Sequence, residues 1–139
     1  MILSEKDNIW YADMNHLEFF KEQMQRLMND RPDSYTKALV YTLGICKDTR
    51  HNFASLYDAK DRSIIPGELH AAWQTDGSRK VTRLAFNLFT DRTVTAYNDG
   101  ADPDYLECGN YSVSEIFCCE YAPLFVEAIK IRYPRYFNI

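Results

Sequence analysis

The chain has 139 residues, of which 46% are apolar and 14% aromatic, and its formal net charge is −4. This length and apolar content suffice for one hydrophobic core, so we expect a single domain over residues 1–139 and exclude a disordered chain. An acidic chain gains little from a general attraction to phosphate, which disfavours bulk binding of nucleic acid. No apolar run approaches the roughly 20 residues of a membrane span. The start of the chain is too charged for a secretion signal, so the sequence predicts a cytoplasmic protein.

The first half of the chain predicts helices with short breaks between them. Apolar residues recur every three or four positions behind a capping box of Asn15 and Glu18, which predicts a helix over roughly 16–29. A broader apolar stripe predicts a central helix over about 34–46, followed by a short third helix. Residues 63–66 are expected to be extended, because they end in a proline.

The second half predicts two further main helices on either side of an irregular segment. Ser78 is expected to cap a helix over about 79–89. Residues 90–109 are rich in Asp, Gly and Pro and predict a long acidic loop. A helix follows Ser112, and Pro123 begins a last helix over 123–133. The expected fold is mainly all-α, with five or six helices, and its core is formed by the helices at 34–46, 79–89 and 123–133.

A block around Trp73 is expected to be structural. Trp73 is predicted to be a core aromatic whose burial contributes several kcal/mol. Arg83 and Asn87 lie one helical turn apart, so they are expected to hold the turn of Trp73, Gln74 and Thr75 by hydrogen bonds.

The start of the helix at 79–89 is the first candidate binding site. Ser78, Arg79, Lys80 and Arg83 stand where unpaired backbone amides and the helix dipole attract anions. The same basic positions, 79–83, are compatible with a helix that reads DNA. A routine cap followed by solvated basic residues is the simpler interpretation.

An acidic run supplies the second candidate. Asp99, Asp102, Asp104 and Glu107 either form a solvated loop or present negative charge to a basic groove on a partner. The run does not meet the ligand spacing of an EF-hand calcium loop.

Cysteine and histidine residues offer a third alternative, a small metal protein or enzyme. The residues concerned are Cys46, His51, His70, Cys108, Cys118 and Cys119. Their spacing matches no zinc pattern, which favours free thiols, no metal and no cofactor. No hydrolase elbow, metalloprotease motif or dinucleotide-binding turn is present, so we expect no enzyme. A Cys–His catalytic pair meets only in space, and the sequence leaves it open.

Several segments carry a resemblance to a known family. They are Trp73-Gln74-Thr75, Ser78, Lys80-Val81, Arg83 to Leu88, Leu43 to Cys46, Asp48 to Arg50, Phe117 to Cys119, Tyr121 to Pro123, Glu127 to Lys130 and Arg132 to Pro134. In these the chain resembles a family of small bacterial proteins of unknown function from anaerobic gut bacteria and their mobile elements. The resemblance covers most of the chain from about residue 14 and implies no activity.

Three functions are therefore carried forward. The first is a non-catalytic protein-binding module of a mobile element, with an inhibitor of a host defence nuclease, like an anti-CRISPR protein, as its concrete form. The second is a nucleic-acid accessory protein that uses the basic helix at 79–83. The third is the Cys/His metal protein or enzyme. The expected partner is an unidentified protein, with nucleic acid disfavoured and no membrane.

Overall fold

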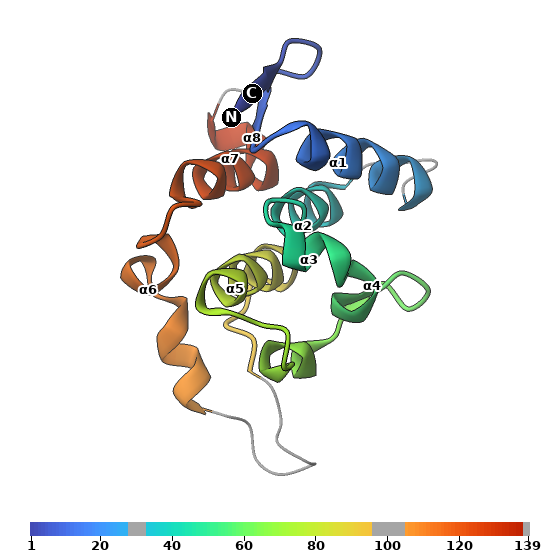
Figure 1. The fold of residues 1–139 in the computed structure, drawn as a ribbon. Coiled ribbons are helices and arrows are strands. Elements are labelled where there is room, and N and C mark those ends of the chain that lie inside the picture. The colour runs from blue at the N-terminus through green and yellow to red at the C-terminus, as the bar shows by residue number, and fades with distance from the viewer. Residues whose placement is uncertain (28–32, 96–104, 138–139) are drawn as a thin grey trace.

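The computed structural model describes residues 1–27, 33–95 and 105–137, and these residues are mainly helical (Figure 1). Their α-helices are α1 (Met14–Leu27), α2 (Ser34–Leu43), α3 (Lys47–His51), α4 (Phe53–Leu56), α5 (Asp76–Thr90), α6 (Val113–Phe117), α7 (Ala122–Arg132) and α8 (Pro134–Phe137). Two 3₁₀-helices, η1 (Pro66–His70) and η2 (Tyr105–Tyr111), accompany them. Strands β1 (Ile2–Ser4) and β2 (Ile9–Tyr11) pair antiparallel, as do β3 (Tyr57–Asp58) and β4 (Ser63–Ile64). The predicted fold class is confirmed.

Helix α2 forms the centre of the core. Its residues from Ala38 to Leu43 are all buried, and all of them except Thr42 are apolar, as expected for the part of a helix that is enclosed by the core. It packs mainly against α5 and α7, and Figure 1 shows it between α1 and α5. The predicted core of three helices is therefore confirmed, although α2 ends at Leu43, three residues earlier than expected, with Gly44 as its C-cap.

Gly44 allows α1 to approach the end of α2 closely. A Cβ atom at this position would lie 2.8 Å from Cδ2 of His16 and 2.8 Å from Cδ1 of Phe19. Such a contact is too short for a real Cβ atom, so only glycine fits here without a shift of the His16 and Phe19 rings. This close approach places the His16 ring against the core.

Two helix starts differ from the expected caps. The Asp13 carboxylate accepts the backbone N–H of His16 at 2.9 Å, so Asp13, and not Asn15, caps α1. Helix α5 is capped by Thr75, and Ser78 occupies the third helical position, where the two side chains form a reciprocal capping box. The prediction of Ser78 as N-cap is therefore wrong by one turn, although Ser78 does complete the cap.

The end of the segment at 90–109, which was predicted to be a loop, is helical. Residues 105–111 form η2, while residues 96–104 lie outside the described part of the chain. Helix α5 ends where Asp91 adopts a left-handed conformation with φ of 60°. The prediction of a cap at Ser112 is confirmed, because its hydroxyl accepts the N–H of Glu115 at 3.2 Å.

His16 is a fully buried, neutral histidine. Its Nδ1 accepts the N–H of Ala12 at 2.9 Å, so the proton resides on Nε2, which donates to the Tyr41 carbonyl oxygen at 2.7 Å. Burial lowers the pKa of His16 to about 4, with an opposing contribution from the Tyr41 hydrogen bond and a further lowering by Arg50. Protonation would place an uncompensated charge in the core.

This pKa predicts an acid-sensitive fold. The folded pKa of about 4 lies below the ordinary value of 6.5, so the unfolded state binds more protons between these pH values. We expect acidification through this window to lower the free energy of unfolding by roughly 3 kcal/mol more in the wild type than in a His16→Gln variant. Urea unfolding at several pH values measures the difference. An NMR titration that finds an ordinary pKa for His16 would contradict the prediction.

Candidate functional site

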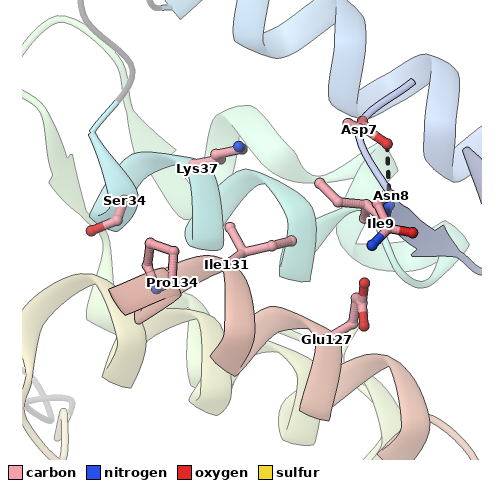
Figure 2. Close-up of a pocket in the computed structure, with 8 residues that line it drawn as sticks. All are labelled: Asp7, Asn8, Ile9, Ser34, Lys37, Glu127, Ile131 and Pro134. Atoms are coloured by element: carbon pink, nitrogen blue, oxygen red, sulfur yellow. Dashed lines mark hydrogen bonds between the residues drawn. The ribbon is translucent and has the colours of Figure 1, made fainter. Parts of the chain in front are cut away.

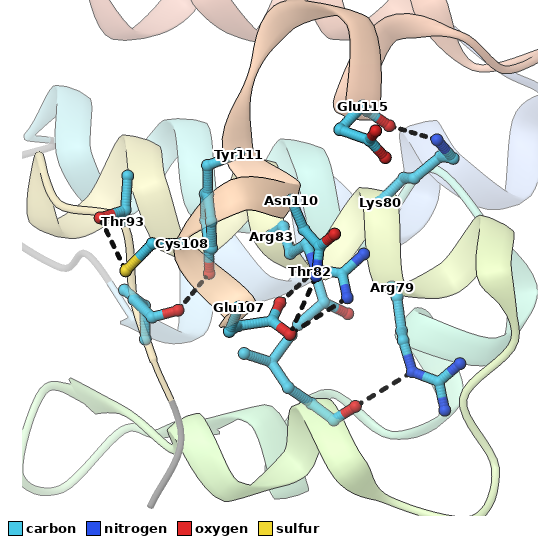
Figure 3. A network of polar contacts seen from close by, with 12 residues as sticks. Arg79, Lys80, Thr82, Arg83, Thr93, Glu107, Cys108, Asn110, Tyr111 and Glu115 are labelled. Atoms are coloured by element: carbon cyan, nitrogen blue, oxygen red, sulfur yellow. Dashed lines mark hydrogen bonds and ion pairs between the residues drawn. The ribbon is translucent and has the colours of Figure 1, made fainter. Parts of the chain in front are cut away.

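The predicted basic residues line one cleft of about 450 Å³ between α5, η2 and α6 (Figure 3). Its lining consists of Asp76, Arg79, Lys80, Arg83, Asn110 and Glu115. The first four residues come from successive turns of α5, which explains why the sequence pattern found the three cations. The two residues from the C-terminal segment were not predicted, because only the folded chain brings them there.

Arg83 is engaged by a buried carboxylate. It forms an ion pair with Glu107, and its Nη2 lies 3.3 Å from Glu107 Oε2. Only 15% of the Arg83 side chain and 6% of the Glu107 side chain are exposed. Asn110 Nδ2 donates to the same oxygen at 3.3 Å. The interpretation of Glu107 as a charge presented to a partner is therefore wrong, because this residue holds η2 against α5.

The other two cations are also bonded within the chain. Arg79 Nε donates to the Leu69 carbonyl oxygen at 3.2 Å, and its guanidinium lies 3.8 Å from the exposed Asp76 carboxylate. Lys80 donates to the backbone carbonyl of Glu115. Each cation thus joins α5 to a different neighbouring segment. The three cations that line the cleft therefore fasten η1, α6 and η2 to α5.

Of the two residues predicted to form the structural turn before α5, Gln74 is buried and Trp73 is only half-buried. Trp73 is half-buried, not a full core residue, and its Nε1 donates to Glu68 at 2.9 Å. Gln74 is buried, and its Nε2 donates to Thr82 Oγ1 at 3.1 Å and to the Glu68 carbonyl oxygen at 3.2 Å. Gln74 itself therefore ties the turn to α5.

The expectation that Arg83 and Asn87 hold this turn is wrong. Arg83 is paired with Glu107, and Asn87 donates to the carbonyl oxygen of Arg92 at 3.0 Å. Asn87 therefore secures the chain just after the end of α5. Both side chains bond to segments that follow α5 in the chain.

The remaining candidates do not gather in one place. Within residues 1–27, 33–95 and 105–137, no group of three or more His, Cys, Asp or Glu side chains is arranged to hold a metal ion. Cys46 is buried with its Sγ 3.1 Å from Thr49 Oγ1, whereas Cys118 is exposed. Three predicted acidic residues lie outside the described residues, namely Asp99, Asp102 and Asp104.

An exposed face on the N-terminal hairpin was missed by the sequence analysis. Leu3 and Trp10 are paired across β1 and β2, and the two residues are 40% and 44% exposed. Met1, two residues before Leu3, is 66% exposed. Ile9 and Tyr11 point to the opposite face and are buried. We call Met1, Leu3 and Trp10 the hairpin face; Figure 1 shows the hairpin at the end of the molecule where α7 and α8 lie.

Trp10 is held in a fixed backbone position. Its N–H donates to Glu127 Oε1 at 3.1 Å, and its carbonyl oxygen accepts the Tyr41 hydroxyl at 2.5 Å. Burial raises the pKa of Tyr41, which keeps this hydroxyl protonated as a donor. Glu127 on α7 and Tyr41 on α2 thus hold the backbone N–H and the carbonyl oxygen of Trp10. The indole therefore projects from a strand whose backbone is fixed. No sequence signal revealed this, since each strand has only three residues.

Comparisons with known proteins place the chain in a family. None of the helices in the described residues has the length and apolar character needed to cross a membrane. No curated protein and no solved structure matches the chain. A family model matches residues 6–139, which is nearly the whole chain. The chain therefore belongs to a family of unknown function, DUF6075.

Proposed function

We propose that this protein is a non-catalytic binding module whose hairpin face docks onto another protein. The observation that supports this proposal is the exposed Trp10 on a strand whose backbone is fixed by Glu127 and Tyr41. Tryptophan is enriched among the residues that dominate the energy of protein interfaces. An aromatic side chain on a rigid strand also loses little conformational freedom when it binds.

The charges around the hairpin indicate the kind of partner. Glu5 and Asp7 lie in the hairpin turn and Asp13 follows β2, and all three are exposed, whereas Lys6 is the one exposed side-chain cation between Ile2 and Asp13. An apolar face with a mainly acidic rim is complementary to an apolar patch with a basic rim. A second copy of this chain would bring acidic rims together, so the proposed partner is a different protein with a basic surface.

Proteins that handle nucleic acid have such basic surfaces. A nuclease of a host defence system is therefore the concrete partner proposed, with the present chain acting as its inhibitor from a mobile element. The acidity of the chain and its family resemblance motivate this form of the proposal.

The nucleic-acid alternative receives less support. It requires Arg79, Lys80 and Arg83 to be free for phosphate or base contacts. Arg83 is engaged by the buried Glu107, and the other two are bonded to backbone carbonyl oxygens. All three side chains therefore already donate to acceptors within the chain, which leaves fewer free donors for a nucleic acid.

Site-specific crosslinking tests the proposed docking face. A photoreactive amino acid placed at Trp10 should capture a specific protein in host cells, and the captured protein should have a basic surface patch. Val113 is 75% exposed on α6 and serves as the matched control position, where no such product is expected. Equal labelling from both positions, or no product from Trp10, would contradict the proposal. A crosslink to a second copy of the chain would show that the argument from the acidic rim is wrong.

A further inference from the structure

The two strands of the N-terminal hairpin have edges of different kinds. The edge of β2 faces the helices, where Glu127 and Tyr41 hold the backbone N–H and the carbonyl oxygen of Trp10. A pocket of about 270 Å³ lies on this side of the hairpin, and its lining includes Ile9, Lys37 and Glu127 (Figure 2). Strand β1, in contrast, has its main contacts with β2, so its outer edge lies away from the helices.

The strand register shows which backbone groups of β1 point outward. In an antiparallel ladder, pairs whose backbone groups bond to each other alternate with pairs whose groups point away from each other. Leu3 pairs with Trp10, whose backbone groups bond to Glu127 and Tyr41 on the side away from β1. Leu3 therefore points its own N–H and carbonyl oxygen away from β2. Among the described residues, neither of these two groups has a hydrogen-bond partner.

Leu3 thus presents a backbone donor and a backbone acceptor at an open strand edge. Met1 and Glu5, two positions before and after it, are exposed as well. Unpaired N–H and C=O groups at the edge of a sheet are a template for pairing with another chain. Proteins protect such an edge by a short strand, a proline or a charged side chain within it. Strand β1 is short, with three residues, but it contains neither a proline nor a charge.

We propose that this protein binds its partner by β-strand addition, in which an extended segment of the partner pairs with the outer edge of β1. This inference rests on the proposed docking function and specifies its geometry. In an antiparallel arrangement, the partner residue opposite Leu3 forms two backbone hydrogen bonds with it. The side chain of that residue then points to the face that Leu3 and Trp10 share, because paired residues point to the same face of a sheet. The added strand therefore extends the hairpin face.

The charges beside β1 specify the sequence of the added strand. Glu5 and Asp7 are exposed in the turn that follows β1, together with the single cation Lys6. A segment with an apolar residue opposite Leu3 and basic residues at its ends is complementary to this edge. The proposed occupant is therefore an extended, basic-flanked segment of the partner protein.

A synthetic peptide tests the open edge without the partner. The peptide alternates valine and threonine and carries lysine at both ends. In the free full chain, NMR should show that the Leu3 amide exchanges with solvent deuterium faster than the Ser4 amide, which lies in the ladder with β2. Saturation with the peptide should slow exchange at Leu3 by about tenfold or more, the effect of one added hydrogen bond. Slow exchange at Leu3 in the free chain, or exchange that the peptide leaves unchanged, would overturn the proposal.

A matched peptide with glutamate at both ends tests the charge argument. It keeps the same strand but places negative charge beside Glu5 and Asp7, so it should bind roughly tenfold more weakly than the lysine peptide at low salt. Equal binding of the two peptides would show that the basic flanks are not recognised, and the assignment of the partner segment would be wrong.

Two variants at one position separate the backbone from the side chain. Leu3→Pro removes the outward N–H but no donor of the hairpin ladder, and Leu3→Ala removes the same side chain but keeps this N–H. Leu3→Pro should therefore bind the lysine peptide about tenfold more weakly than Leu3→Ala does. A protected Ser4 amide in Leu3→Pro shows that the hairpin persists, and equal affinities of the two variants would then overturn the proposal. If the hairpin is lost in Leu3→Pro, exchange at Leu3 in the wild type decides the question.

Failure of this inference differs from failure of the proposed function. If the lysine peptide protects the Leu3 amide but no protein is captured from Trp10, the edge pairs with strands and the docking function is wrong. If a captured partner binds Leu3→Pro as tightly as Leu3→Ala, the docking function stands and strand addition is wrong. Self-association of the wild type that only Leu3→Pro abolishes would identify a second copy as the occupant and overturn the assignment of a basic partner segment.

Discussion

Replacing Glu107 with alanine is expected to lower the free energy of unfolding by about 3–5 kcal/mol, because it leaves the Arg83 guanidinium buried without its anion. Asn110 also loses its acceptor in this variant. The pair holds η2 to α5, so the variant should also loosen the C-terminal segment. Urea unfolding gives the free energy, and amide hydrogen exchange around Asn110 reports the local loosening.

A double replacement tests the ion pair itself. Arg83→Met combined with Glu107→Leu removes both charges and should recover much of the stability lost by Glu107→Ala, since a buried ion pair can be replaced by apolar residues at little cost. If Glu107→Ala costs less than about 1 kcal/mol, Glu107 is not the buried partner of Arg83, and the structural interpretation of the cleft fails.

Replacing Arg132 with methionine should destabilise the fold by roughly 3 kcal/mol, because three acceptors lose a shared donor, namely the Leu88 carbonyl oxygen, the Asp91 carboxylate and the Ser34 hydroxyl. Arg132 is 7% exposed, and its Nε donates to the Leu88 carbonyl oxygen at 2.9 Å near the C-terminal end of α5. Its Nη2 lies 3.1 Å and 3.2 Å from the two carboxylate oxygens of Asp91. The guanidinium also stacks on the Tyr35 ring, 3.4 Å from its centre.

Two further variants test whether stability depends on the planar guanidinium group of Arg132 or only on its charge. Arg132→Lys keeps the charge but not the planar guanidinium, so it should lose an intermediate amount of stability. Lys130→Met, two residues earlier on the more exposed side of α7, should change the free energy of unfolding by at most about 0.5 kcal/mol. Thermal unfolding of the three variants ranks them, and equal midpoints for Arg132→Met and Lys130→Met would contradict the role of Arg132.

Local patterns predicted the main helices because their signals lie within one segment. The apolar stripe of α2 and the buried face of α5 follow helical spacing, and Pro123 fits the first turn of α7. The predicted N-cap of α5, Ser78, lies one turn after the observed N-cap, Thr75, because both residues are good caps and they stand three positions apart. The sequence cannot distinguish the two members of a reciprocal cap.

Contacts between distant segments could not be predicted. Glu107 lies in an acidic stretch that is typical of solvated loops, yet its partner Arg83 is 24 residues away and the pair is buried. The hairpin strands are too short to display an alternating pattern. The pocket beside them is lined by Lys37 and Glu127, and four α-helices, α3 to α6, lie between these residues in the described part of the chain. Burial and charge pairing decide such positions, and both depend on the complete fold.

The most direct test of the proposed docking function is the affinity of the captured partner for Trp10→Ser. Trp10 is exposed, so this variant should retain the stability of the wild type while affinity falls by at least about 30-fold, which corresponds to a loss of about 2 kcal/mol at an interface hot spot. Val113→Ser should bind as the wild type does. Unchanged affinity in a folded Trp10→Ser variant would contradict the claim that the hairpin face is the binding surface.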